Sequence, residues 1–220
     1  NCAFGSHALQ LNTTAANNSA FGHRALDANT TGASNTAVGS GALGANTTAS
    51  NNTAVGGDAL TANTTGAQNT ALGTYALDAA STLSGITALG YSTLSELTTG
   101  TGGVAVGYRA LQANTTGNNN TAVGYDAGAD ITTGGQNTVV GTLALDACTT
   151  GGDNTVMGYI AGSALNSSAN TLIGYAAGSA ITTGGSNTIV GHQAGDAMTT
   201  GEQNTIMGKG AGTDITTGNY

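Results

Sequence analysis

Histidine and aspartate are the residue types in this chain that could do chemistry, and their spacing argues against a catalytic site. His7, His23 and His192 lie at variable positions after the repeat glycine, many coils apart or without partners, so they predict neither a metal site nor a general base. Asp126 and Asp130 flank a turn that contains glycine, which leaves structural Ca²⁺ as an alternative. However, the aspartate-rich repeat of a calcium roll is missing. We therefore expect no enzyme activity and no cofactor.

A glycine-rich segment and two cysteines complete the chemical candidates. Residues 39–44 match G-x-G-x-x-G, but no strand-helix-strand pattern surrounds them, so we expect no dinucleotide site. Cys2 and Cys148 are predicted to lie too far apart for a disulfide bond. We expect Cys148 in the core, and Cys2 is a candidate for a link between chains.

Charged residues are scarce in the 220-residue chain. It has 3 Lys and Arg against 11 Asp and Glu, a net charge of −8, with 37 Gly and no Pro or Trp. Three basic side chains cannot form a surface for nucleic acid. No apolar stretch is long enough to span a bilayer, and no signal peptide is visible, so we expect that any targeting segment has been removed or omitted. Nucleic-acid binding and membrane insertion are therefore not expected.

A repeat of 17 residues organises the whole sequence. Its marker is a glycine, which we number position 0 of each unit, and one step of 16 residues occurs near Asn166. Thirteen units follow one another, and their marker glycines are Gly5, Gly22, Gly39, Gly56, Gly73, Gly90, Gly107, Gly124, Gly141, Gly158, Gly174, Gly191 and Gly208. Such a period predicts stacked units that bury their apolar side chains against their neighbours.

Seventeen residues suit one coil of an all-β parallel β-solenoid, a β-roll. Short Val-, Ile- and Thr-rich segments alternate with turns of Gly, Asn and Ser, and strands of adjacent coils would stack about 4.8 Å apart. We expect residues 1–220 to form a single domain of about 13 coils. The coil type changes around residues 107–141, where no linker or charge run separates the two halves.

Two adjacent apolar residues precede each marker glycine, as in Ala37-Val38 and Ile189-Val190. Neighbouring side chains on a strand point to opposite sides, so one side would fill the core and the other would form an apolar strip. Such a strip over thirteen coils exceeds what a soluble monomer exposes, which predicts a closed homo-oligomer or a lateral sheet-on-sheet dimer. The candidate oligomer or core residues are Val38, Val55, Leu72, Leu89, Val106, Val123, Val140, Met157, Ile173, Val190 and Met207.

Three positions of the coil exchange volume along the chain. Early units carry Ala at position −2, Leu at +4 and Asn at +7. Later units carry a large apolar residue at −2, Gly at +4 and an apolar residue such as Ile181 at +7. This trade is expected if the three positions share one core space. Stacking also predicts ladders of Asn at −4 and of Thr-Thr pairs, which would add hydrogen bonds along the stack.

Nine Asn-x-Ser/Thr sequons suggest glycans, which would solvate a surface that is poor in charge. A repeat rich in Asn and Thr also generates sequons by composition alone. The candidate acceptors are Asn12, Asn17, Asn29, Asn46, Asn51, Asn63, Asn114, Asn119 and Asn166. Tyr91, Tyr108, Tyr125, Tyr159 and Tyr175 follow their glycine and predict an aromatic stripe, either a stacked ladder or a carbohydrate-binding surface.

The units Asn35–Gly39, Asn120–Gly124 and Asn187–Gly191 resemble the head repeat of YadA-type trimeric autotransporter adhesins, and similar repeats occur in phage tail-fibre proteins. The resemblance covers all thirteen units. It implies a left-handed β-roll, a homotrimer and a role in attachment at a cell or virion surface. The coil here is longer than is usual for that family, and we expect no coiled-coil stalk, neck or membrane-anchor barrel within these 220 residues.

These observations predict an extracellular structural fibre protein that associates with itself. The sequence begins and ends in phase with the repeat and has no polar caps, so we also expect either a longer rod or end-to-end stacking into a fibril. The alternatives are a trimeric adhesin head or phage tail fibre and, in another class, an ice-binding protein with a surface of threonines.

Overall fold

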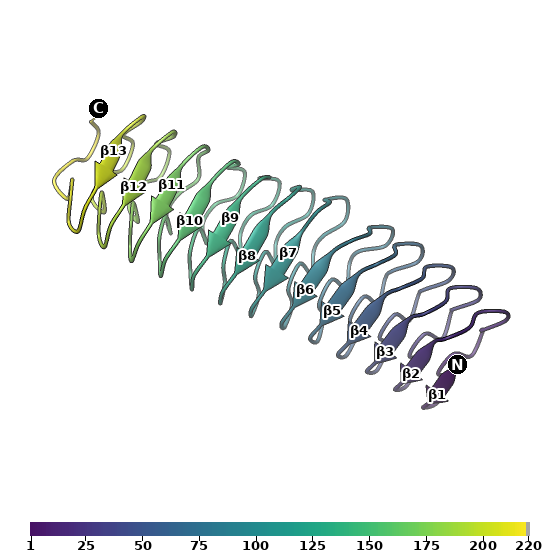
Figure 1. Ribbon diagram of the computed structural model, residues 1–220. Coiled ribbons are helices and arrows are strands. Elements are labelled where there is room, and N and C mark those ends of the chain that lie inside the picture. The colour runs from purple at the N-terminus through teal and green to yellow at the C-terminus, as the bar shows by residue number, and fades with distance from the viewer. Residues whose placement is uncertain (219–220) are drawn as a thin grey trace. The chain divides into compact units, whose positions relative to one another are not determined.

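The computed structural model describes residues 1–218, and within that range it contains only short strands and turns, with no helix. The chain divides into two compact units, Asn1–Val106 and a second unit that begins at Gly107. Each unit is a parallel β-solenoid with one three-residue strand per coil, and the strands follow one another along one side of the unit (Figure 1). The boundary between the units falls at the start of the range in which the coil type changes.

The first unit holds seven strands and the second holds six, all within the described residues. In the first unit they are β1 (Cys2–Phe4), β2 (Ser19–Phe21), β3 (Thr36–Val38), β4 (Thr53–Val55), β5 (Thr70–Leu72), β6 (Thr87–Leu89) and β7 (Val104–Val106). In the second they are β8 (Thr121–Val123), β9 (Thr138–Val140), β10 (Thr155–Met157), β11 (Thr171–Ile173), β12 (Thr188–Val190) and β13 (Thr205–Met207).

Neighbouring strands within a unit pair in parallel, and equivalent residues lie side by side. Val38 of β3 is the partner of Val55 of β4, one full repeat later. Where the repeat is one residue short, Met157 of β10 still pairs with Ile173 of β11. The register confirms the prediction of an all-β parallel solenoid with a 17-residue repeat.

The marker glycine is required by the close approach of successive coils. Its φ lies between +120° and +147° in all thirteen units, a region that side chains other than glycine rarely adopt. A Cβ atom on Gly56 would lie 2.5 Å from both the carbonyl carbon and the carbonyl oxygen of Gly73 in the next coil. The backbone hydrogen bond from Gly73 to Val55 holds the two coils at this spacing. No other residue type fits without separating the coils.

The core is filled by the middle residue of each strand together with the residues at +3 and +4. Ala37, Ala42 and Leu43 are fully buried in the coil that contains β3. Leu43 has a φ of +51°, as leucines at this position do in the other early coils, which costs roughly 1–2 kcal/mol. Burying a leucine contributes about 1.5–3 kcal/mol, enough to offset that strain.

The later coils confirm that positions −2, +4 and +7 share one space. Gly178 occupies position +4, and a Cβ there would lie 2.8 Å from Ile181 Cδ1 and 3.0 Å from Leu172 Cδ2. A leucine at this position would clash with both side chains. The larger residues at −2 and +7 have taken the volume that Leu fills in the early coils.

The asparagine at position −4 closes each coil and joins it to the next. Asn35 Nδ2 donates to the carbonyl of Ala49 in its own coil at 2.8 Å, and its Oδ1 accepts from the backbone N–H of Asn52 at 2.9 Å. Both side chains are fully buried. Because a buried amide without partners is costly, these bonds explain why the position holds Asn in nearly every coil.

The 16-residue coil keeps its register through a side chain. Asn166 stands where the other coils have the first threonine of the Thr-Thr pair. Its Oδ1 accepts hydrogen bonds from the backbone N–H groups of Thr149 and Thr150 at 3.0 and 3.3 Å. In the other coils a backbone carbonyl fills this role, so the side chain compensates for the missing residue.

Candidate functional site: the outer strand face

The first and third residues of every strand point away from the core, and we call the surface they form the outer strand face. The third residues of the strands form a column on this face, and the column includes all eleven residues that were predicted to form an oligomer or core strip. None of the eleven is buried: the exposed fractions are 38% for Val38, 49% for Leu72, 41% for Met157 and 69% for Met207, and the others are exposed or half-buried. The strip therefore lies outside the core.

The outer strand face is narrower than the sequence suggested. A threonine usually holds the first position of each strand, as Thr36 does in β3, so the apolar column is one side chain wide. In the first unit, seven three-residue strands span roughly 330 Å², taking about 4.8 Å per strand and 3.3 Å per residue. The apolar column is only part of this area, so it does not exceed the largest apolar patch of an ordinary monomer. Size alone does not make this face an interface.

Tyrosines at position +1 stack on one another, which confirms the ladder reading of the aromatic stripe. In the second unit, the rings of Tyr108 and Tyr125 lie 5.0 Å apart at an angle of 10°. Tyr159 stacks on Tyr175 at 5.5 Å, and Tyr175 on His192 at 4.8 Å. Where the rings stack, the faces to which sugars bind are covered. Thr142 separates the two stacked runs, and Tyr91 of the first unit meets Tyr75 edge to face at 6.0 Å instead.

The two threonines of each Thr-Thr pair differ in role. Thr30 and Thr47 each donate a hydroxyl hydrogen bond to a backbone carbonyl of the next coil, at 3.0 and 3.2 Å. The second threonine is exposed in each of the twelve coils that have one, as at Thr31 and Thr48. The first threonine therefore belongs to the fold, whereas the second forms a row of solvent-facing side chains along each unit, with Ser167 in place of one threonine in the second unit.

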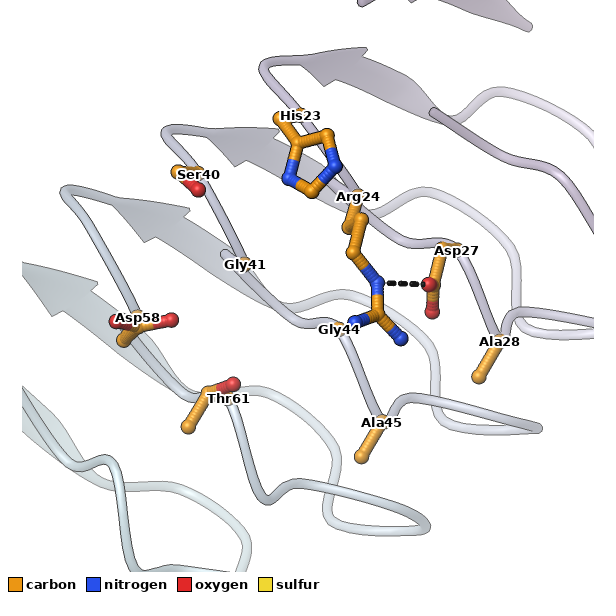
Figure 2. A pocket seen from close by; sticks show the side chains of 10 residues that line it. All are labelled: His23, Arg24, Asp27, Ala28, Ser40, Gly41, Gly44, Ala45, Asp58 and Thr61. Carbon is orange, nitrogen blue, oxygen red and sulfur yellow. Dashed lines mark hydrogen bonds and ion pairs between the residues drawn. The ribbon is translucent and has the colours of Figure 1, made fainter. Parts of the chain in front are cut away.

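A hollow of about 530 Å³ lies on the side of the first unit, where one coil carries glycine at two variable positions, Gly41 and Gly44 (Figure 2). Arg24 Nε donates to Asp27 Oδ2 at 2.8 Å on one side, and Asp58 flanks the hollow on the other. The ion pair is largely exposed on the arginine side, so it stabilises little. The sequence of residues 39–44 predicts no dinucleotide site, and the hollow beside them was not predicted; the two glycines at variable positions were the available signal.

Two aspartates of the turns are held in unfavourable surroundings. Burial, with the nearby Asp58 and Glu96 carboxylates, raises the pKa of Asp78, and burial with Asp130 and Asp126 raises the pKa of Asp146. One carboxylate oxygen of each lacks a hydrogen-bond partner among the described residues. Ionisation of either side chain therefore works against folding.

The nine candidate glycan acceptors fall into three groups. The side chains of Asn29, Asn46, Asn63 and Asn114 are buried, which works against glycans at these four positions in the folded chain. Their role is structural, since Asn46 Nδ2 donates to Asn29 Oδ1 at 2.9 Å and Asn63 Nδ2 donates to Asn46 Oδ1 at 2.9 Å.

The amides of two further acceptors are already engaged. Asn12 Nδ2 donates to the carbonyl of Ala15, and Asn166 Nδ2 donates to Thr149 Oγ1. Asn17, Asn51 and Asn119 are exposed at an outward turn, each with φ near +60°. The glycan expectation therefore stays open at these three turn positions.

The remaining chemical candidates are scattered over the described residues. His7 Nδ1 lies 2.6 Å from Gln10 Oε1, and the rings of His7 and His23 meet edge to face at 6.0 Å. Cys2 is exposed, whereas Cys148 is buried, as predicted, and burial raises the pKa of its thiol. Residues 1–218 contain no cluster of three or more metal-ligating side chains, and no helix there is suited to crossing a membrane.

Comparisons with known protein families, with curated proteins and with solved structures found no match for this chain.

Proposed function

We propose that this chain is a non-enzymatic structural segment of an extracellular fibre, which associates with copies of itself through the outer strand face. The single observation that carries the proposal is the outward column of large apolar side chains that runs through every coil of each unit; its members are exposed or half-buried, and Phe21, Leu72 and Met157 are among the exposed ones. Burying such side chains against a partner is favourable, while the solenoid supplies a rigid support for them.

The finer expectations belong to the same proposal. A left-handed coil and a homotrimer follow from the resemblance to adhesin head repeats, and attachment at a cell or virion surface is the alternative role. Glycans at Asn17, Asn51 and Asn119 would add solubility to the turns, which carry few charges.

Sedimentation velocity over a hundredfold range of protein concentration tests the proposed function. We expect species heavier than the 21.1 kDa chain, with a larger fraction at higher concentration. Electron micrographs of the same samples should contain elongated particles. A single 21.1 kDa species at every concentration would contradict self-association.

The row of exposed threonines along each unit favours ice binding as a second candidate. Hydroxyl and methyl groups repeat once per coil along this row, at a spacing of about 4.8 Å, and most of its neighbours are small and uncharged. Thermal hysteresis and ice shaping at micromolar protein concentration test the candidate. Loss of both effects in Thr48→Lys would support it, and absence of hysteresis in the natural protein would dismiss it.

A further inference from the structure

The outer strand face carries no charged residue at any of its positions. Every Asp and Glu of the sequence falls between positions +2 and +12 of its repeat unit, in the turns, and so do Arg24 and Arg109. Lys209 at position +1 and Asp153 at position +12 are the charged residues nearest to the face, each two residues away from a strand. Interface cores are depleted of charge, and a chain with a net charge of −8 repels its copies elsewhere. Two copies therefore approach most easily with these faces opposed.

The side chains on the face vary in size, which favours a protein partner over a crystalline surface. Phenylalanine stands at Phe21, valine at Val38 and Val55, and leucine at Leu72 and Leu89. A flat lattice needs equal heights, whereas side chains of unequal size can interdigitate with a second set. A second copy of this chain carries the same uncharged, uneven column, so it is the partner that we infer.

We propose that two copies pair outer strand face to outer strand face in several registers, offset from one another by whole coils. This inference rests on the proposed self-association. A shift of one coil keeps the repeat position of every contact, because adjacent strands align equivalent residues; the side chain is unchanged between Val38 and Val55 and differs in size between Phe21 and Val38. An offset pair leaves part of each face uncovered, and that part is available to a third copy.

Because the face is small, contacts with more than one neighbouring copy are needed for a stable assembly. Two faces of roughly 330 Å² bury about 660 Å² per unit, less than the roughly 1,200 Å² of a standard stable interface. A pair of faces alone is therefore a weak contact. Copies that each bridge two neighbours make more contacts, so a growing ribbon is favoured over a discrete dimer.

Disulfide mapping on the full chain tests the offset registers. Single reporters Thr36→Cys, Thr53→Cys and Thr70→Cys, each with Cys2→Ser, place a thiol on the outer strand face in three successive coils. Isotope-labelled Thr53→Cys protein is mixed with each unlabelled reporter and oxidised, and mixed disulfides are counted by mass spectrometry. We expect yields within about threefold of one another for all three partners, since each register brings a different pair within bonding distance.

Thr48→Cys is the matched control, because Thr48 is exposed in the same repeat but lies off the face. It should form mixed disulfides at least about tenfold less often. In sedimentation, Val38→Glu should weaken association by about tenfold or more, while Thr48→Glu leaves it within about twofold.

The outcomes separate the two proposals. One dominant disulfide pair would overturn the offset registers and leave self-association standing. Equal yields from Thr48→Cys and Thr53→Cys, or equal effects of the two Glu variants, would overturn the assignment of the face. A chain that stays monomeric throughout would refute the proposed function itself.

Discussion

Replacing a marker glycine with alanine should unfold the coil around it, whereas the adjacent glycine should tolerate the same change. Gly56 has φ +137°, and its added Cβ would lie 2.5 Å from the carbonyl group of Gly73 and 2.8 Å from the N of Thr74. Gly57 adopts no such φ, and its Cβ would meet only the Thr74 side chain, at 3.7 Å. The two variants differ in position by one residue and in chemistry not at all.

The size of the effect follows from what must move. Relieving the contact separates two coils and weakens the hydrogen bonds from Gly56 to Val38 and from Gly73 to Val55, at about 1 kcal/mol each. The unfavourable φ adds about 1–3 kcal/mol. We therefore expect Gly56→Ala to lower the free energy of unfolding by about 3–5 kcal/mol, and Gly57→Ala to change it by less than about 1 kcal/mol.

Thermal unfolding followed by circular dichroism measures the difference. For a chain of this length, 3–5 kcal/mol corresponds to a fall in Tm of about 6–20 °C for Gly56→Ala, with almost none for Gly57→Ala. Equal Tm values for the two variants would refute the claim that close stacking of successive coils fixes the marker glycine.

Three further predictions concern single side chains. Asn63 Oδ1 has no hydrogen-bond partner among the described residues because Ala80 follows where the buried ladder would continue, whereas Asn46 Oδ1 accepts from Asn63 Nδ2; Asn46→Ala should therefore lower the free energy of unfolding by about 1 kcal/mol more than Asn63→Ala in urea titrations, and equal losses would contradict the ladder. The folded-state pKa of Asp78 is raised above 3.8, so its ionised form opposes folding, and the stability of the protein falls as the pH rises through the window above 3.8. Asp78→Asn should therefore raise Tm at pH 7 and have little effect on Tm at pH 3. An equal gain in Tm at both pH values would exclude the carboxylate as the cause. Peptide mapping after secretion from a glycosylating host should find glycans at Asn17, Asn51 or Asn119 and none at Asn29, Asn46, Asn63 or Asn114, and occupancy of any buried acceptor would contradict the folded structure.

The sequence was sufficient to predict the solenoid because its repeat is set by backbone geometry. Position 0 accepts only glycine, so Gly39 and Gly56 mark the period directly. The exchange between Leu and Gly at position +4 was also readable, since the volume lost there reappears at residues such as Ile181. The glycine at position 0 and the residue at position +4 are both fixed by steric requirements, and these requirements are visible in the sequence of the repeat units.

Local sequence could not reveal the roles of identical side chains. Asn46 and Asn51 both head a sequon, yet one is buried in a ladder and the other is exposed at a turn. Thr47 donates to the next coil, whereas its neighbour Thr48 faces solvent. Which residue faces inward depends on where each turn bends, and leucines with positive φ, such as Leu43, help to set those bends.

The three methionines provide the most direct test of whether another copy covers the outer strand face. Met157 and Met207 lie on that face, 41% and 69% exposed, while Met198 is fully buried. Hydroxyl-radical footprinting of the assembled protein should leave Met157 and Met207 as slow to oxidise as Met198, with exposed Tyr175 labelled as the internal reference. Rapid oxidation of Met157 and Met207 in the assembly, in the order of their exposure in the single chain, would contradict the account.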